Sequence, residues 1–101
     1  MPPRRYGLVR IAASTRVDKK LMAVFRDVGT GAEKTVHFGH AAYSDFTIHR
    51  DEARKQRYVA RHSAREDWTD PTTAGALSYW ILWNRPTLGA SIADYKRRFG
   101  F

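Results

Sequence analysis

Residues 21–38 read LMAVFRDVGTGAEKTVHF, and this stretch predicts a β-hairpin. Its two ends, 21–25 and 34–38, are rich in the β-branched and aromatic residues that favour strands. Its middle, residues 27–33, holds two glycines that can supply the positive φ angles of a turn. Residues 6–11 alternate in polarity, so we expect a third strand there.

Beyond the hairpin the sequence changes to helical patterns. A first helix is expected over about 50–63, where two acidic residues in the first turn complement the helix dipole. A second helix is expected to open at Asp70-Pro71, because Asp is a preferred N-cap and Pro is favoured at the first helical position. This second helix should run to about Trp83, before the Asn84-Arg85-Pro86 break.

The third helix has the clearest signals of the three. Thr87 can cap its start, and Gly100 follows its expected end at about Phe99. Its apolar residues recur at helical spacing and should face a core: Leu88, Ile92, Tyr95 and Phe99. The predicted fold is therefore α+β, with a small antiparallel sheet packed against three short helices. One domain should span 1–101, with a basic arm or first strand over 1–19, a hairpin region over 20–45 and a helical region over 46–101.

Composition limits the classes of function. The chain has 101 residues, a net charge of +8 and a pI of about 10.3, and a pI above roughly 9 is typical of nucleic-acid-binding domains. Attraction to an acidic protein or lipid surface is the other explanation of such a charge. The chain has no cysteine, which excludes disulfide scaffolds, cysteine zinc modules and thiol catalysis and fits a reducing, intracellular compartment. Its longest apolar run is far shorter than a membrane-spanning helix, so no membrane partner is expected.

Basic residues are concentrated near the N-terminus. Residues 1–26 carry a net charge of +6, since only Asp18 opposes the cations. The first 16 residues have the Arg-rich, acid-free composition of a transit peptide, but we favour a basic arm or first strand. The residues predicted to contact nucleic acid in this segment are Arg4, Arg5, Arg10, Arg16, Lys19 and Lys20.

A second group of cations falls on the first predicted helix. At 100° per residue, an unbroken helix would place five arginines within an arc of about 80°. Like charges at such spacings repel, so either neighbouring acids or phosphates should supply the counter-charge. Arginine binds phosphate well, because its planar fork can donate two hydrogen bonds. These five predicted phosphate contacts are Arg50, Arg54, Arg57, Arg61 and Arg65.

No catalytic motif stands out. A metal site could be drawn from His37, His40, Asp45 and His49, but the spacing matches no standard ligand pattern, and we expect neither metal nor cofactor. Ser44 with Asp45 and His49 lacks the nucleophile elbow of a hydrolase. We therefore expect a protein without enzymatic activity.

A resemblance covers about residues 20–99. Its motifs are KTVHFG at 34–39, YSDFT at 43–47, RKQRY at 54–58, REDW at 65–68, LWN at 82–84, PTL at 86–88 and KRRF at 96–99. With these motifs the chain resembles a group of short basic proteins of unassigned function from large DNA viruses of algae and protists and from some algal genomes. The resemblance implies a viral or virus-derived context, and it implies that hairpin and helices form one unit.

These observations together predict a nucleic-acid-binding protein of low sequence specificity, with DNA favoured over RNA. It would be associated with a viral genome, in the virion or in the nucleus or cytoplasm of the host. The alternative from another class is a virion structural module, in which aromatic residues and arginines bind a viral structural protein. A small metal-dependent nuclease is the third possibility.

Overall fold

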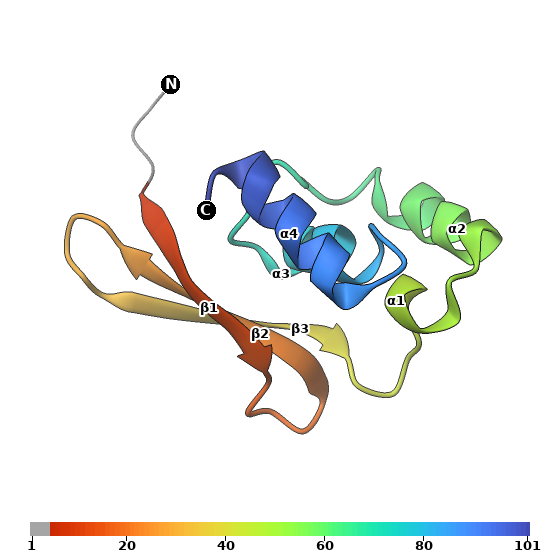
Figure 1. The fold of residues 1–101 in the computed structure, drawn as a ribbon, viewed down its shortest axis with the longest axis horizontal. Helices are drawn as coiled ribbons and strands as arrows, with labels where there is room; N and C mark the ends of the chain where they lie inside the picture. Colours follow the sequence, from red (N-terminus) through yellow and green to blue (C-terminus); the bar gives the residue numbers. More distant parts are fainter. Residues whose placement is uncertain (1–4) are drawn as a thin grey trace.

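The predicted hairpin forms one part of an antiparallel sheet. The computed structural model describes residues 5–101, and it contains strands β1 (Tyr6–Ala13), β2 (Lys19–Asp27) and β3 (Glu33–His40) (Figure 1). The spatial order is β1-β2-β3, and the register pairs Leu21 with Phe38. The hairpin and the third strand are therefore confirmed, and each strand is longer than the sequence pattern indicated.

Asp27 organises the turn between β2 and β3. Its carboxylate accepts hydrogen bonds from the backbone amides of Gly29 (2.8 Å) and Thr30 (3.1 Å). Gly31 has a φ of 77°, in the left-handed region that glycine enters without steric cost. The turn chemistry predicted for 27–33 is therefore present.

The helical half contains more and shorter elements than expected. They are α1 (Phe46–His49), α2 (Glu52–His62), α3 (Ala74–Leu77), the π-helix η1 (Ser78–Leu82) and α4 (Leu88–Phe99). The second helix does not open at Pro71 as predicted. Asp70 instead closes a local turn by accepting a hydrogen bond from the Thr72 amide (3.0 Å), and Thr73 caps α3. Within residues 5–101, no helix is both long and apolar enough to cross a membrane.

The capping signals of helix α4 are confirmed. Of its predicted core residues, Tyr95 is buried, and Ile92 and Phe99 pack partly buried against the core, but Leu88 is 37% exposed, so its prediction as a core residue is wrong. The Thr87 hydroxyl accepts a hydrogen bond from the Ala90 amide (3.2 Å), which is the predicted N-cap. Gly100 ends the helix in the left-handed conformation, with a φ of 70°. These two residues fix the ends of the element that closes the core.

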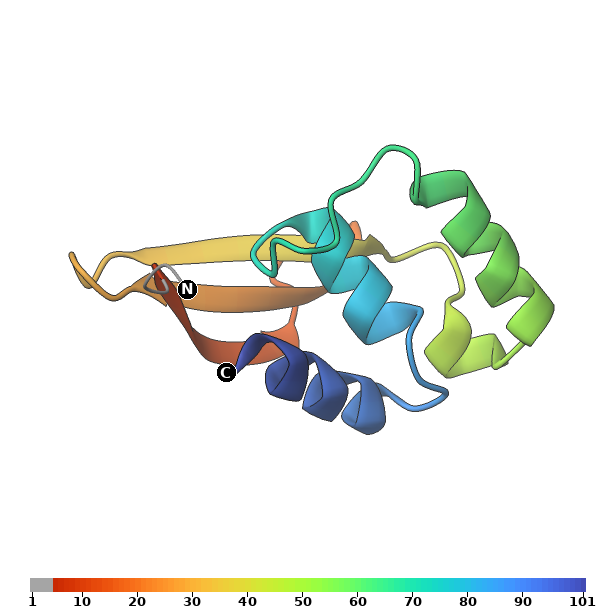
Figure 2. The same ribbon diagram turned by 90° about the horizontal axis from the view of Figure 1, so that it is seen from above.

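The core lies between one face of the sheet and the helices α3, η1 and α4. These helices cover that face, whereas α1 and α2 lie beyond the end of β3 (Figures 1 and 2). The fold is α+β, as predicted. The buried core residues come from both layers and are each at most 4% exposed: Ala23, Phe25, Phe38, Leu77, Ile81, Leu82 and Tyr95.

A buried carboxylate holds α4 against the segment that precedes it. Asp94 accepts hydrogen bonds from Arg98 Nε (2.8 Å) and Asn84 Nδ2 (2.7 Å), and Arg97 and Arg85 also pair with it. Burial alone would raise the pKa of Asp94, but the hydrogen bonds from Arg98 and Asn84 outweigh burial and lower it. The arginines at the end of α4 therefore have a structural partner in addition to the helix dipole.

Candidate nucleic-acid interface

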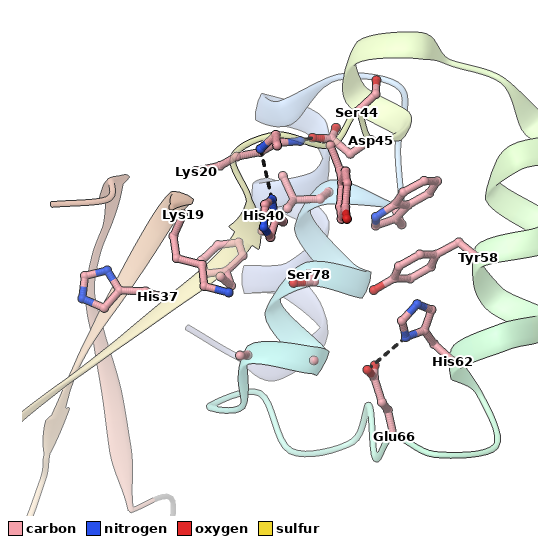
Figure 3. A pocket seen from close by; sticks show the side chains of 18 of the residues that line it. Lys19, Lys20, His37, His40, Ser44, Asp45, Tyr58, His62, Glu66 and Ser78 are labelled. Carbon is pink, nitrogen blue, oxygen red and sulfur yellow. Dashed lines mark hydrogen bonds and ion pairs between the residues drawn. The ribbon is translucent and has the colours of Figure 1, made fainter. Parts of the chain in front are cut away.

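A cleft of about 630 Å³ lies between the sheet and α2 (Figure 3). One wall comes from the end of the hairpin and carries Lys19, Lys20, His37 and His40. The opposite wall comes from α2, and η1 lies between the two walls. The α2 wall carries Arg54, Tyr58, Arg61 and His62.

Gly39 lets the sheet wall lie directly on η1. Its φ is 78°, and a Cβ at this position would lie 2.6 Å from Leu82 Cδ1. A larger residue would therefore need both an unfavourable backbone conformation and a displaced core side chain. Glycine at this position therefore allows the end of β3 to pack closely against Leu82 of η1.

An ion pair fixes the loop between β3 and α1. Lys20 Nζ lies 2.5 Å from Asp45 Oδ2, and the side chains are 18% and 3% exposed. Asp45 is also the N-cap of α1, since it accepts a hydrogen bond from the Thr47 amide (2.9 Å). The pair joins β2 to α1, and it takes up the charge of Lys20.

Aromatic stacking positions the α2 wall. The Tyr58 ring stacks on Trp83, with ring centroids 4.3 Å apart and planes 5° apart, and also on His62, with centroids 4.2 Å apart. His49 packs against the same Trp83, at 5.3 Å. Burial, with the nearby carboxylate of Glu66, raises the pKa of Tyr58, so its phenol is neutral and contributes packing rather than proton transfer.

Glu66 closes the far end of this wall. Its carboxylate lies 3.1 Å from His62 Nδ1 and accepts a hydrogen bond from Trp68 Nε1 (2.8 Å). Gly75 makes room for it, because a Cβ there would lie 2.9 Å from Glu66 Oε2. The Glu66 carboxylate is thus hydrogen-bonded to its neighbours His62 and Trp68, and it is not an unpartnered negative charge in the cleft.

The cleft therefore has unpaired cations and no unpaired carboxylate. Its acidic residues are Asp45 and Glu66, and both have the partners described above. Within the described chain, no acid forms an ion pair with Lys19, Arg54 or Arg61. Because Lys19 comes from β2 and the arginines from α2, positive charge faces the cleft from both walls.

An exposed aromatic ring lies at the same cleft. Tyr43, in the loop between β3 and α1, is 70% exposed and is a cleft-lining residue. It stacks on His40, with centroids 4.5 Å apart. Tyr43 is not among the contact residues predicted from the sequence. The available signal was a tyrosine in the loop that follows a strand, three residues after a histidine.

The structure divides the N-terminal group of predicted contacts. Arg5 pairs with Asp27 (3.1 Å) and Arg16 with Asp18 (2.9 Å). Arg10 is an exposed residue of β1, and Arg4 lies outside the described residues. Two acids beyond residue 26 therefore offset part of the positive charge of residues 1–26. Asp27 pairs with Arg5, and Glu33 pairs with Arg26 (2.9 Å).

The predicted stripe of five arginines is not a continuous helical face. Arg50 ends α1 with a φ of 53°, and its Nε donates a hydrogen bond to the Pro86 carbonyl (2.9 Å). Arg65 lies beyond the end of α2 at His62. Helix α2 keeps Arg54, Arg57 and Arg61, of which the first and third line the cleft.

The histidines weighed as metal ligands have other neighbours. His37 Nδ1 lies 2.7 Å from the Ser14 hydroxyl, and His40 Nδ1 accepts a hydrogen bond from the Ala42 amide (3.1 Å). His49 Nδ1 accepts one from the Asp51 amide (2.9 Å). Across residues 5–101, no three His, Asp or Glu side chains are grouped closely enough to hold a metal ion.

One comparison with known proteins gives a match. The profile of a family of unknown function (DUF5754) matches residues 9–62, just over half of the chain. The matched segment contains most of β1, the hairpin, α1 and α2, and so it includes both cationic walls of the cleft. Neither a curated protein nor a solved structure matches the chain.

Proposed function

The chain belongs to this family of unknown function, DUF5754, and we propose that it is a non-enzymatic nucleic-acid-binding protein of low sequence specificity. One observation carries the proposal: Lys19, Arg54 and Arg61 line one cleft from two walls, and none of the three forms an ion pair within the described chain. Positive charges repel one another, so this arrangement of cations is most favourable when a polyanion supplies the counter-charge. Phosphates do so with release of condensed counterions.

The same geometry supports low specificity. Contacts from arginine and lysine to phosphate orient a nucleic acid but carry no sequence information. DNA is the favoured ligand in this proposal, because residues 20–99 resemble short basic proteins of large DNA viruses. We place the protein with a viral genome, in the virion or in the nucleus or cytoplasm of an infected cell.

A salt series tests the proposal. Affinity for a short labelled DNA, single-stranded and duplex, would be measured between about 50 and 200 mM salt, where phosphate contacts weaken steeply. We expect Arg54→Gln/Arg61→Gln to weaken binding and to reduce the salt slope for the single strand by roughly 1.4, since each phosphate contact contributes about 0.7. Affinity indifferent to salt, or no binding at the lowest salt, would contradict the proposal.

The matched control removes the same charge elsewhere. Arg10→Gln/Arg57→Gln lowers the net charge equally, but Arg10 is on β1 and neither Arg10 nor Arg57 lines the cleft. We expect this double variant to keep most of the salt slope. A poly-aspartate competitor addresses the structural-protein alternative. If poly-aspartate displaced DNA at equal charge concentration, the partner would be an acidic protein surface.

A further inference from the structure

Tyr43 differs from every other aromatic residue in the described chain. Its side chain is 70% exposed, whereas the other Phe, Tyr and Trp rings of residues 5–101 are buried or half-buried. Exposing a large ring forgoes the stabilisation that burial provides. A ring held in solvent at the edge of a cationic cleft is the arrangement that proteins use to stack nucleobases.

The ring is held in place before any ligand arrives. It stacks on His40, with planes 26° apart, and the Tyr43 amide donates a hydrogen bond to the His40 carbonyl (3.2 Å). The loop is also fixed on both sides, because the Ala41 amide donates to the Asp18 carbonyl (3.0 Å) and Asp45 pairs with Lys20. One face of the ring is covered by His40, and its exposure shows that the other is open.

An open ring face selects the form of nucleic acid. In a duplex, each base is stacked on both sides by its neighbours, so a protein ring cannot cover it without unstacking the helix. A single strand presents free base faces, and these stack on aromatic side chains with little sequence preference. The cleft volume of about 630 Å³ is within the range of sites for small ligands, which suits one or two nucleotides better than a duplex.

We propose that the cleft binds single-stranded nucleic acid, with a base stacked on Tyr43 and the phosphates between Lys19 on one wall and Arg54 and Arg61 on the other. The proposal rests on the proposed function and adds the form of the ligand and the residue that selects it. Stacking would add to the electrostatic attraction without giving sequence specificity.

Three probes of equal length separate bases from phosphates: an oligothymidine strand, the same strand with abasic sites throughout, and a duplex. We expect the protein to bind oligothymidine roughly tenfold more tightly than the abasic strand, which corresponds to about 1.4 kcal/mol. Tyr43→Ala should remove this preference while leaving affinity for the abasic strand and the duplex unchanged. Tyr43→Phe, which retains the ring, should keep the preference.

The other outcomes are distinct. Equal affinity of the wild type for oligothymidine and the abasic strand would overturn the stacking proposal but leave phosphate binding intact. A preference that survives in Tyr43→Ala would assign stacking to another ring and overturn the role of Tyr43. Absence of binding to all three probes would overturn the proposed function itself.

Discussion

The two walls of the cleft are anchored in different ways. The sheet wall belongs to a layer whose core residues, such as Phe25 and Phe38, are no more than 1% exposed and pack against η1 and α4. In α2 the one buried residue is Tyr58. This helix is attached through the Tyr58–Trp83 stack, through the contact of His62 with Glu66, and through Lys55. The Lys55 Nζ donates to the Asn84 carbonyl (2.8 Å) and lies 5.0 Å from the centre of the Phe46 ring.

The difference separates the part of the fold that provides most of the stability, the core, from α2, which carries candidate contact residues. The free energy gained by burying apolar surface increases in proportion to the buried area, and it stabilises the sheet and its covering helices cooperatively. A helix attached by the contacts of a few side chains can open at lower free energy than the core. The cleft therefore has one wall fixed by the core and one wall, α2, whose position depends on very few side chains.

The largest effect should follow a change in the core. Phe25→Ala removes a fully buried ring that contacts Phe101 and belongs to the core cluster to which η1 and α4 also contribute. We expect it to lower the free energy of unfolding by about 3–5 kcal/mol, or to prevent folding altogether. Chemical denaturation would measure this. Val28→Ala, at a position that is 68% exposed, should change stability by no more than about 0.5 kcal/mol. A loss for Phe25→Ala as small as that of the control would contradict the assignment of the core.

A smaller and local effect is expected in α2. Tyr58→Ala removes the stack on Trp83, and we expect it to lower the opening free energy of α2 by about 2 kcal/mol. Native-state hydrogen exchange should show faster exchange of the α2 amides and unchanged exchange in β2. Tyr58→Phe, which keeps the ring, serves as the control. If β2 lost protection to the same extent, the two walls would be one cooperative unit and the comparison would be wrong.

The elements that build the core, the strands and α4, were predicted well from the sequence. Strands and α4 have local signals: β-branched runs, a glycine turn, the Thr87 cap and Gly100. Propensity and capping act over a few residues, so they can be recognised without the fold. The wrong prediction of a helix start at Asp70-Pro71 shows the limit of such local signals. Asp70 can cap either a helix or a turn, and in the structure it caps a turn.

The cleft could be predicted only in part. Arg54, Arg61, Lys19 and Lys20 were chosen from their charge, and the fold brings all four to the cleft. Which of them are free depends on pairs formed across long stretches of chain, such as Lys20 with Asp45. Four-residue helices like α1 also lack the length to show a periodic pattern, so the break that separates Arg50 from α2 was invisible in the sequence.

The smallest expected effect concerns His49, which lies on α1 against Trp83 and so next to the stack that holds α2. Its Nδ1 accepts the Asp51 amide hydrogen bond, which places the ring proton on Nε2, and that atom is buried without a hydrogen-bond partner in the described chain. Burial first, and then the charge of Arg54, lower the pKa of His49, although Asp51 and Asp45 partly oppose this and Lys20 adds to it.

The sign of the pH effect follows from this lowered pKa. The unfolded chain, in which histidine titrates near pH 6.5, binds the proton more readily than the folded chain. His49 should therefore favour folding above about pH 6.5 and lose that contribution as the pH falls through the lower pKa of the folded state. Denaturation of wild type and His49→Phe at a series of pH values isolates the effect, because the two proteins share every other titratable group. We expect the wild type to lose stability relative to His49→Phe on acidification, and α2 to lose exchange protection before β2 does. A stability difference that stays constant with pH would show that His49 titrates as it does in the unfolded chain, and that acid does not act on the α2 wall through this ring.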